Sequence, residues 1–406
     1  MYRITKPLNR KIKAVKKLFL YSFIILITSF CQKNDKPKLY GTVKKIEPNI
    51  EHSNALNLNK LNIKPTLIEL ETLNNSLIGE IKAVKFLRSE KIFIADTRDE
   101  LRILIFKFDG SFYKEFNMSG RGPGEYSKID DFQVRGDSVL QILDGRLKTI
   151  YSYNFFNNNF IESKEIPFYA YKFEYIEDEL GFIFYKNEKA NNFENENNFY
   201  DLILTDKNLR TLDSKIPFYL VKGKSHFSIS RNQVFSESNG VIYYSDMNTD
   251  SIYSISNSGI TTSYHIDYGG KKIDLSSITF SSAIEKMRYL YENSEDKIPM
   301  TLYVFSSKNK IWISFPFNNQ LYLSAYDIAE DSTITYDKIE HSSFLDGSLP
   351  VPKFIDGGLF VSIIDENFAD HLLKANTELK EKNKITSIIN GNSNPILILF
   401  NANDIK

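Results

Sequence analysis

Residues 91–134 read KIFIADTRDELRILIFKFDGSFYKEFNMSGRGPGEYSKIDDFQV. They contain four short runs rich in β-branched and aromatic residues, at 91–96, 101–108, 111–116 and 129–134. Such runs favour β-strands, and Asp109-Gly110 between the second and third runs is typical of a tight turn. We interpret the stretch as an antiparallel meander. Four strands within about 40 residues match one blade of a β-propeller.

The same stretch holds a glycine-rich heptapeptide, Gly120-Arg121-Gly122-Pro123-Gly124-Glu125-Tyr126. Alternate glycines can expose backbone N–H groups to a phosphate, but a dinucleotide fingerprint needs Gly-x-Gly-x-x-Gly at the start of a helix. Here Pro123 lacks an N–H group, and no helical pattern follows it. We therefore interpret the heptapeptide as a structural loop between strands, with glycines that adopt positive φ.

Asp96, Phe108-Asp109-Gly110 and the heptapeptide resemble the bacterial six-bladed β-propeller lipoproteins, relatives of the NHL-repeat propellers. The resemblance covers about Leu67 to the C-terminus and is most specific between residues 70 and 153. It implies a six-bladed propeller that a bacterium exports and anchors by lipid. It implies little about chemistry, because most members have no established activity.

Composition excludes other classes of protein. The 406 residues include 31 Phe and 24 Tyr but one Trp, so a WD-type propeller with one Trp in each blade is excluded. Residues 1–30 hold seven Lys or Arg and no acidic residue, which leaves 44 basic and 51 acidic residues in the remainder. A mildly acidic chain of this kind is a poor candidate for binding nucleic acid.

Residues 1–30 are predicted to be a signal peptide. Basic residues precede the apolar run Leu18–Phe30, which is too short to span a bilayer comfortably but suits a signal h-region. Cys31 follows at once and resembles the acylated cysteine of a lipobox, which predicts lipid attachment there and a place at the outer membrane, facing the periplasm or the cell surface. The bulky Phe30 leaves an alternative, an uncleaved N-terminal anchor.

Cys31 is the single cysteine of the chain, so no disulfide can form within the chain and no metal site can be built on several thiolates. Residues 31–64 are polar and rich in Lys and Asn, which predicts a flexible tether. Residues 65–406 are then the propeller. Two internal repeats support a propeller. Asp96 recurs as Asp144 after 48 residues, and Glu-Ile-Pro-Phe at 165–168 recurs as Lys-Ile-Pro-Phe at 215–218.

The sequence thus predicts an all-β fold, a six-bladed β-propeller of four-stranded antiparallel blades. The apolar C-terminal run 395–400 is predicted to pair with a strand at 66–72, so that strands from both ends close the ring. Mixed three- and four-residue apolar spacings predict a short helix within 276–293, inserted between blades four and five. A second helix is expected within 368–380.

No constellation of catalytic residues stands out. Asp246 and Asp250 begin like a calcium loop, but Ser251 and Asn257 occupy the positions that need Gly and Glu, so we interpret the segment as a polar turn. The five histidines form no ligand pair, and no Gly-x-Ser-x-Gly elbow occurs. We predict no catalytic residue, no metal ligand and no cofactor, although a spatial metal site stays open.

The predicted function is that of a monomeric, lipid-anchored binding or scaffolding module, whose ligand is a glycan or a partner protein of the envelope. The alternative is a metal-dependent enzyme, lactonase- or lyase-like, with its site on the central channel. Polar side chains that converge at one end of the channel would favour the enzyme, and a channel plugged by apolar side chains would favour the module.

Overall fold

The computed structural model describes residues 43–88, 90–96, 101–176, 180–187, 200–217, 232–247, 250–275, 278, 280–342, 347–375 and 382–406. The predicted signal peptide, Cys31 and the first part of the predicted tether lie outside these ranges.

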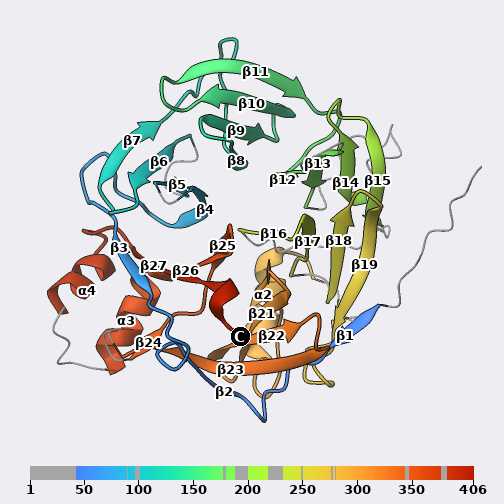
Figure 1. Ribbon diagram of the computed structural model, residues 1–406, viewed down its shortest axis with the longest axis vertical. Coiled ribbons are helices and arrows are strands. Elements are labelled where there is room, and N and C mark those ends of the chain that lie inside the picture. Colours follow the sequence, from blue (N-terminus) through green and yellow to red (C-terminus); the bar gives the residue numbers. More distant parts are fainter. Residues whose placement is uncertain are drawn as a thin grey trace, which may run out of the picture. The chain divides into compact units, whose positions relative to one another are not determined.

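Residues 43–406 form six antiparallel sheets arranged in a ring, so the predicted six-bladed propeller is confirmed (Figure 1). Blades one to three consist of β4 (Ile81–Leu87), β5 (Lys91–Asp96), β6 (Ile103–Lys107) and β7 (Phe112–Phe116); β8 (Asp131–Arg135), β9 (Val139–Asp144), β10 (Thr149–Asn154) and β11 (Asn159–Glu165); and β12 (Lys172–Tyr175), β13 (Leu180–Tyr185), β14 (Tyr200–Asp206) and β15 (Thr211–Pro217).

Blades four to six consist of β16 (Phe235–Ser238), β17 (Val241–Tyr244), β18 (Ser251–Ser256) and β19 (Gly259–Ile266); β20 (Tyr303–Ser307), β21 (Lys310–Phe317), β22 (Gln320–Asp327) and β23 (Ser332–Glu340); and β25 (Phe354–Asp356), β26 (Leu359–Ile364), β27 (Ile396–Asn401) and β3 (Thr66–Glu69). Within each blade the first strand of the list lies innermost.

The strands are apolar on both faces because each blade packs between two others. In β5, Ile92 and Ile94 pack toward blade six, whereas Phe93 and Ala95 pack toward blade two. Six apolar clusters of this kind occur among the described residues, one at each interface between neighbouring blades. Aromatic side chains fill these interfaces, as in the edge-to-face contact of Phe93 with Phe155, whose ring centroids lie 5.0 Å apart.

Strands from both ends of the chain close the ring, as predicted. In blade six, β27 lies between β26 and β3, and Ile398 pairs with Leu67 in antiparallel register. The buried amide of Asn394 fixes this junction, because its Nδ2 donates to the carbonyl oxygens of Glu71 and Ser76, both at 2.9 Å. Its Oδ1 accepts a hydrogen bond from the Ile78 N–H at 2.8 Å.

One strand assignment at the start of the propeller was wrong. The run 129–134 does not complete the first blade, because β4 already supplies its innermost strand, and it begins blade two as β8. The chain leaves blade one at the outer strand β7 and must return to the axis. The glycine-rich heptapeptide therefore lies on a connection between blades.

The predicted tether is also wrong for residues 43–64. β1 (Lys44–Ile46) adds a parallel strand to the outer edge of β19, and β2 (Asn54–Asn57) adds one to β23. A further short strand, β24 (Ser348–Leu349), also pairs with β23. Apolar side chains of the segment are buried in the ring: Ile46, Leu56, Leu58 and Ile63. The polar composition of residues 43–64 gave no sign of β1 and β2, because short edge strands bury few of their side chains.

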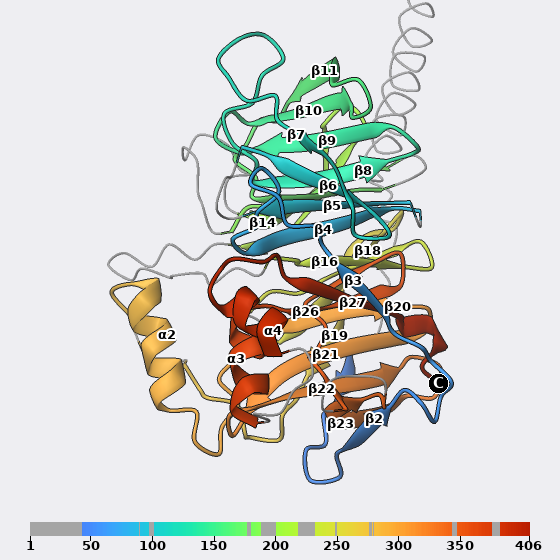
Figure 2. The same ribbon diagram turned by 90° about the vertical axis from the view of Figure 1, so that its left-hand side faces the viewer.

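Helices are few. α2 (Ala283–Glu292) lies between blades four and five as predicted, with Ser282 as its N-cap, whose side chain accepts from the Glu285 N–H at 3.1 Å. α3 (Glu366–Ala375) falls largely within the second predicted region, whereas α4 (Lys382–Ile389) was not predicted (Figure 2). A 3₁₀ turn, η2 (Ala402–Asp404), follows β27. None of the helices that the structure describes has the length and apolar character needed to cross a membrane.

Candidate functional site

The innermost strands surround a cavity of about 820 Å³ on the propeller axis. Its lining combines polar and apolar side chains and comes mainly from β4, β8, β12, β16 and β25, together with the loop that joins β18 to β19. Each of these strands belongs to a different blade, so residues that are far apart in sequence meet here. We call this space the axial cavity.

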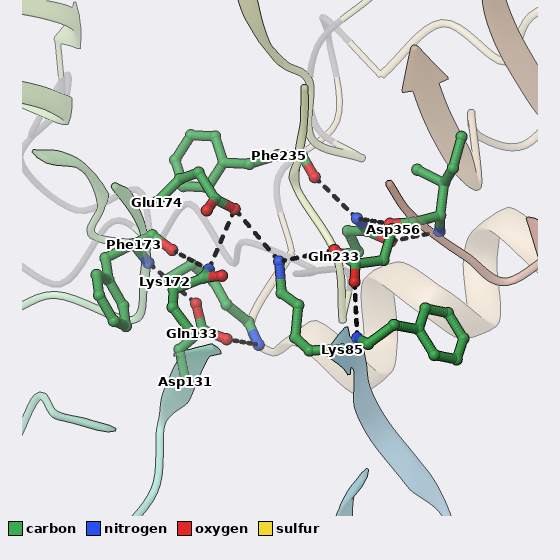
Figure 3. Close-up of polar contacts among 11 residues, drawn as sticks. Lys85, Asp131, Gln133, Lys172, Phe173, Glu174, Gln233, Phe235 and Asp356 are labelled. Carbon is green, nitrogen blue, oxygen red and sulfur yellow. Dashed lines mark hydrogen bonds and ion pairs between the residues drawn. The ribbon is translucent and has the colours of Figure 1, made fainter. Parts of the chain in front are cut away.

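Lys85 of β4 links three blades across the axial cavity. Its Nζ lies 3.4 Å from Glu174 Oε2 on β12 and 3.8 Å from Asp356 Oδ1 on β25 (Figure 3). Asp356 Oδ2 also accepts a hydrogen bond from the Phe86 N–H at 2.7 Å. One ammonium group therefore serves two carboxylates from different blades.

Blades two and three are joined by a second set of polar contacts beside the first. Gln133 Nε2 donates to the Phe173 carbonyl oxygen at 2.8 Å and to Glu174 Oε2 at 3.1 Å. The buried Asp131 accepts from the Phe173 N–H at 3.0 Å and lies 3.4 Å from Lys172 Nζ. The side chains of β8 thus fix the inner end of β12.

The other side of the ring is joined by uncharged groups. The Gln233 amide exchanges two hydrogen bonds with the Ile355 backbone, at 2.7 and 2.9 Å, and so joins the segment before β16 to β25. Ser236 of β16 and Ser306 of β20 share a buried hydrogen bond of 3.1 Å. All six innermost strands, or the residues directly before them, therefore take part in polar contacts between blades.

The ionisation of this cluster reflects a balance of burial and charge. Burial raises the pKa of Glu174 and of Asp356 above their ordinary values, and the Lys85 ammonium only partly opposes this effect. Burial also disfavours the charged form of Lys85, but the carboxylates of Glu174, Asp356 and Asp131 outweigh it and raise the pKa of Lys85 above its ordinary value. The cluster favours a charged lysine shared by two carboxylates.

The polar contacts at the axis bear on the two predicted functions, a binding module and a metal-dependent enzyme. The channel is not plugged by apolar side chains, yet its converging carboxylates hold an ammonium group of the same chain at the point between them (Figure 3). Across the described ranges, no group of three or more His, Cys, Asp or Glu side chains has a geometry that could hold a metal ion. The polar groups of the cavity can therefore act as hydrogen-bond donors and acceptors toward a ligand.

Of the other residues that the sequence singled out, Asn257 lines the axial cavity, whereas Asp246, Asp250, Asp96, Asp144 and the heptapeptide do not. Asp246 is buried, with Oδ2 accepting from the Tyr244 hydroxyl at 2.6 Å, whereas Asp250 pairs with Lys272. Asp96 and Asp144 are each the last residue of the second strand of a blade, and each accepts a hydrogen bond from an N–H of the segment that enters the blade: Asp96 from Gly79 at 2.8 Å and Asp144 from Ser127 at 2.7 Å. Asp96 and Asp144 therefore fix the segments that enter blades one and two in the same way.

The heptapeptide makes contacts within the protein. Glu125 Oε2 accepts from the Gly122 N–H at 2.7 Å, and the Tyr126 hydroxyl accepts from the Met118 N–H at 3.0 Å and donates to the Leu101 carbonyl oxygen at 2.8 Å. The expected positive φ occurs at Gly124 (+77°), not at Gly120 or Gly122. Gly120 instead leaves room for the Glu125 carboxylate, because a Cβ there would lie 1.8 Å from Glu125 Oε2 and would displace this side chain.

Sequence reasoning missed the cluster at the axis. Lys85, Glu174 and Asp356 each interrupt or end the innermost strand of a blade, and this polar interruption of an apolar strand was the available signal. It becomes informative only when the blades are placed side by side, because 89 residues separate Lys85 from Glu174.

One solved structure agrees with the fold, and a family model matches most of the chain. The structure is similar to that of a protein from Bacteroides fragilis described as a "putative exported protein", with a TM-score of 0.67 and 16% identity over 90% of this chain and 100% of that one. A streptogramin B lyase matches with a TM-score of 0.35 and 11% identity over 70% of this chain and 93% of that one. No curated protein sequence matches. Residues 41–401 match the family described as "Domain of unknown function (DUF4934)", and the chain therefore belongs to this family.

Proposed function

We propose that this chain is an exported, lipid-anchored propeller of the bacterial envelope that binds a glycan in its axial cavity without converting it. The observation that carries the proposal is the axial cavity of about 820 Å³, lined by amide, carboxylate and hydroxyl groups from several blades. Its volume falls within the usual range for small-molecule sites, about 300–1,000 Å³. A cavity of this kind favours glycan binding over the alternative function, a scaffold for a partner protein.

The chemistry of the lining suits a sugar. Saccharide hydroxyls both donate and accept hydrogen bonds, and the cavity offers acceptors in the Glu174 and Asp356 carboxylates and in the amide oxygen of Gln133. Tyr175 adds an aromatic ring to the lining. Rigid strands position all of these groups, which reduces the ordering that binding requires.

A binding module is favoured over a metal-dependent enzyme by the position of Lys85. A divalent cation between Glu174 and Asp356 would meet the Lys85 ammonium, 3.4 and 3.8 Å from these carboxylates, and the two cations would repel each other. Lys85 also supplies the positive charge that the carboxylates need. The carboxylates are thus paired before any ligand arrives.

The test is calorimetric titration of residues 32–406 with the tetramers of N-acetylglucosamine and of glucosamine, followed by chromatography of the sugar. We expect saturable binding, unchanged sugar and no effect of a chelator. Glu174→Gln should weaken binding, whereas Glu330→Gln, at an exposed glutamate in the turn between β22 and β23, should not. Metal-dependent product formation would favour the enzyme, and retention of an envelope protein without sugar binding would favour the scaffold.

Anchoring is tested separately. The cysteine that follows the signal-like segment and the resemblance to exported lipoproteins support lipid attachment at Cys31. We expect Cys31→Ser to abolish labelling by a fatty-acid analogue and to release the protein from membranes. A variant that loses the label but stays in membranes would indicate an uncleaved anchor, and a variant that keeps the label is acylated elsewhere.

A further inference from the structure

A row of polar side chains crosses blade two from the axis toward the rim. In the register of the sheet, Gln133 of β8 pairs with Gln141 of β9, Gln141 with Ser152 of β10, and Ser152 with Glu162 of β11. The first three are almost fully buried, with 5%, 2% and 4% of their surfaces exposed. We call these four residues the blade-two row.

The blade-two row lies on the face that packs against blade three. Leu143 and Ile150, on the same strands and the same face, belong to the apolar cluster that these two blades share. Where the row replaces such residues, a pocket of about 520 Å³ remains. We call it the lateral pocket.

The lateral pocket adjoins the axial cavity. Four residues line both spaces, namely Gln133, Val134, Glu174 and Tyr175. The Arg135 guanidinium, which also lines the lateral pocket, lies 3.4 Å from the centre of the Tyr175 ring and holds it in place. A ligand longer than the axial cavity could thus extend along the blade-two row.

Gln141 gives this pocket a specific hydrogen-bonding requirement. Its Nε2 donates to Ser152 Oγ at 3.3 Å, whereas its buried Oε1 has no hydrogen-bond partner among the described residues. A buried polar atom without a partner is unfavourable. Rotating the amide by 180° would exchange the two atoms and still leave one of them unpaired, so a group that can both donate and accept fits either orientation.

Charge narrows the class of ligand. The two linings together hold four carboxylates, Glu162, Glu174, Glu237 and Asp356, and two cationic groups, Lys85 and Arg135. Glu162 is exposed and lies 3.4 Å from Lys164 Nζ, so the linings retain a small excess of negative charge, which disfavours anions relative to neutral or basic ligands. A neutral or amine-bearing sugar carries no negative charge, and its hydroxyl groups can both donate a hydrogen bond to Gln141 and accept one from it.

We propose that the lateral pocket is a second saccharide subsite, contiguous with the axial cavity, in which the Gln141 amide hydrogen-bonds to a hydroxyl group of a neutral or amine-bearing glycan. This inference rests on the proposed glycan binding in the axial cavity. It adds that binding depends on glycan length and that acidic glycans are rejected.

The test compares Gln141→Leu with the unchanged protein, using residues 32–406 and full-length protein in detergent, titrated with glucosamine and with its tetramer. We expect the variant to bind the tetramer about 3- to 10-fold more weakly, the effect of one lost hydrogen bond, and to bind glucosamine equally well. Its melting temperature should be equal or higher, because the substitution removes an unpaired buried polar atom. Tetragalacturonate should bind neither protein.

Ser314→Ala is the matched control, since Ser314 also has a buried side-chain oxygen without a partner in the described part of the chain but lines neither space. It should leave tetramer binding unchanged. If Gln141→Leu binds the tetramer as well as the unchanged protein while Glu174→Gln weakens it, the subsite is refuted and binding in the axial cavity stands. If neither sugar binds the unchanged protein, the subsite and the proposed function both fail.

Discussion

Lys85 joins two carboxylates at the axis of the ring, and its charge therefore contributes to stability in a pH-dependent way. The raised pKa values of Glu174 and Asp356 mean that the folded protein holds protons on them more readily than the unfolded chain does, so their contribution falls as pH rises above the ordinary carboxyl range. The raised pKa of Lys85 contributes stability that is fully present below the ordinary lysine pKa and is lost only as pH rises through the folded value.

At the residue scale we predict that Lys85→Met lowers the free energy of unfolding by about 2 kcal/mol near neutral pH. This is below the usual cost of breaking a fully buried pair because the Lys85 and Glu174 side chains are 16% and 21% exposed. The loss should shrink at a pH close to the ordinary carboxyl pKa, because the raised pKa values of Glu174 and Asp356 let these groups take up protons there. Urea denaturation at both pH values measures it, with Lys64→Met, at an exposed lysine, as the control. An equal loss at both pH values would mean that the lysine acts by packing alone.

The same residues show why the site could not be predicted from the sequence. Hydrophobic patterning carries no information on which strand ends face each other across a ring, so it could not bring Lys85 and Glu174 together. The environment of the Gln141 amide could not be predicted either, because it depends on the register that aligns Gln141 with Ser152 and leaves Oε1 without a partner among the described residues. Motifs that are contiguous in sequence, such as the heptapeptide, proved to make contacts within the fold instead.

At the scale of elements, patterning succeeded where strands are long and buried on both faces. The β27 run is apolar at five successive positions and was predicted together with its partner β3. β1 and β2 were missed because each is three or four residues long and buries one side chain, Ile46 or Leu56. Such strands are stabilised by backbone pairing with the outer edge of another strand, here β19 or β23. That edge lies far away in the sequence, so the local sequence of β1 and β2 does not reveal it.

The connection between blades one and two gives the prediction at this scale. Gly124 has a φ of +77°, and a Cβ there would lie 2.9 Å from the Phe160 ring, whereas Gly136 has a φ of +54° with no atom within 4 Å. Gly136→Ala should cost about 1 kcal/mol of stability from backbone strain alone. Gly124→Ala should cost more, about 2–3 kcal/mol, because the ring must also move. Thermal unfolding of the two variants measures the difference, and equal losses would show that Phe160 yields freely.

At the scale of the whole propeller, blade six makes the two ends of residues 43–406 one structural unit. Its innermost strands β25 and β26 come from late in the chain, its outermost strand β3 comes from the beginning, and β27 holds them together. Each blade packs against both neighbours, so a defect in blade six also exposes the facing sides of blades one and five. Stability should therefore be shared around the ring.

Deleting residues 395–406 is expected to prevent stable folding of the whole ring. The deletion removes five successive buried side chains, Ile396 to Phe400, each worth about 1.5–3 kcal/mol, and their sum is on the order of the entire net stability of a domain. Circular dichroism and thermal unfolding would show a lost or strongly lowered transition. A synthetic peptide of residues 394–406 should restore it, because the gap between β26 and β3 remains able to accept a strand. An unchanged melting temperature after the deletion would show that β27 is peripheral and that the ring is closed by other contacts.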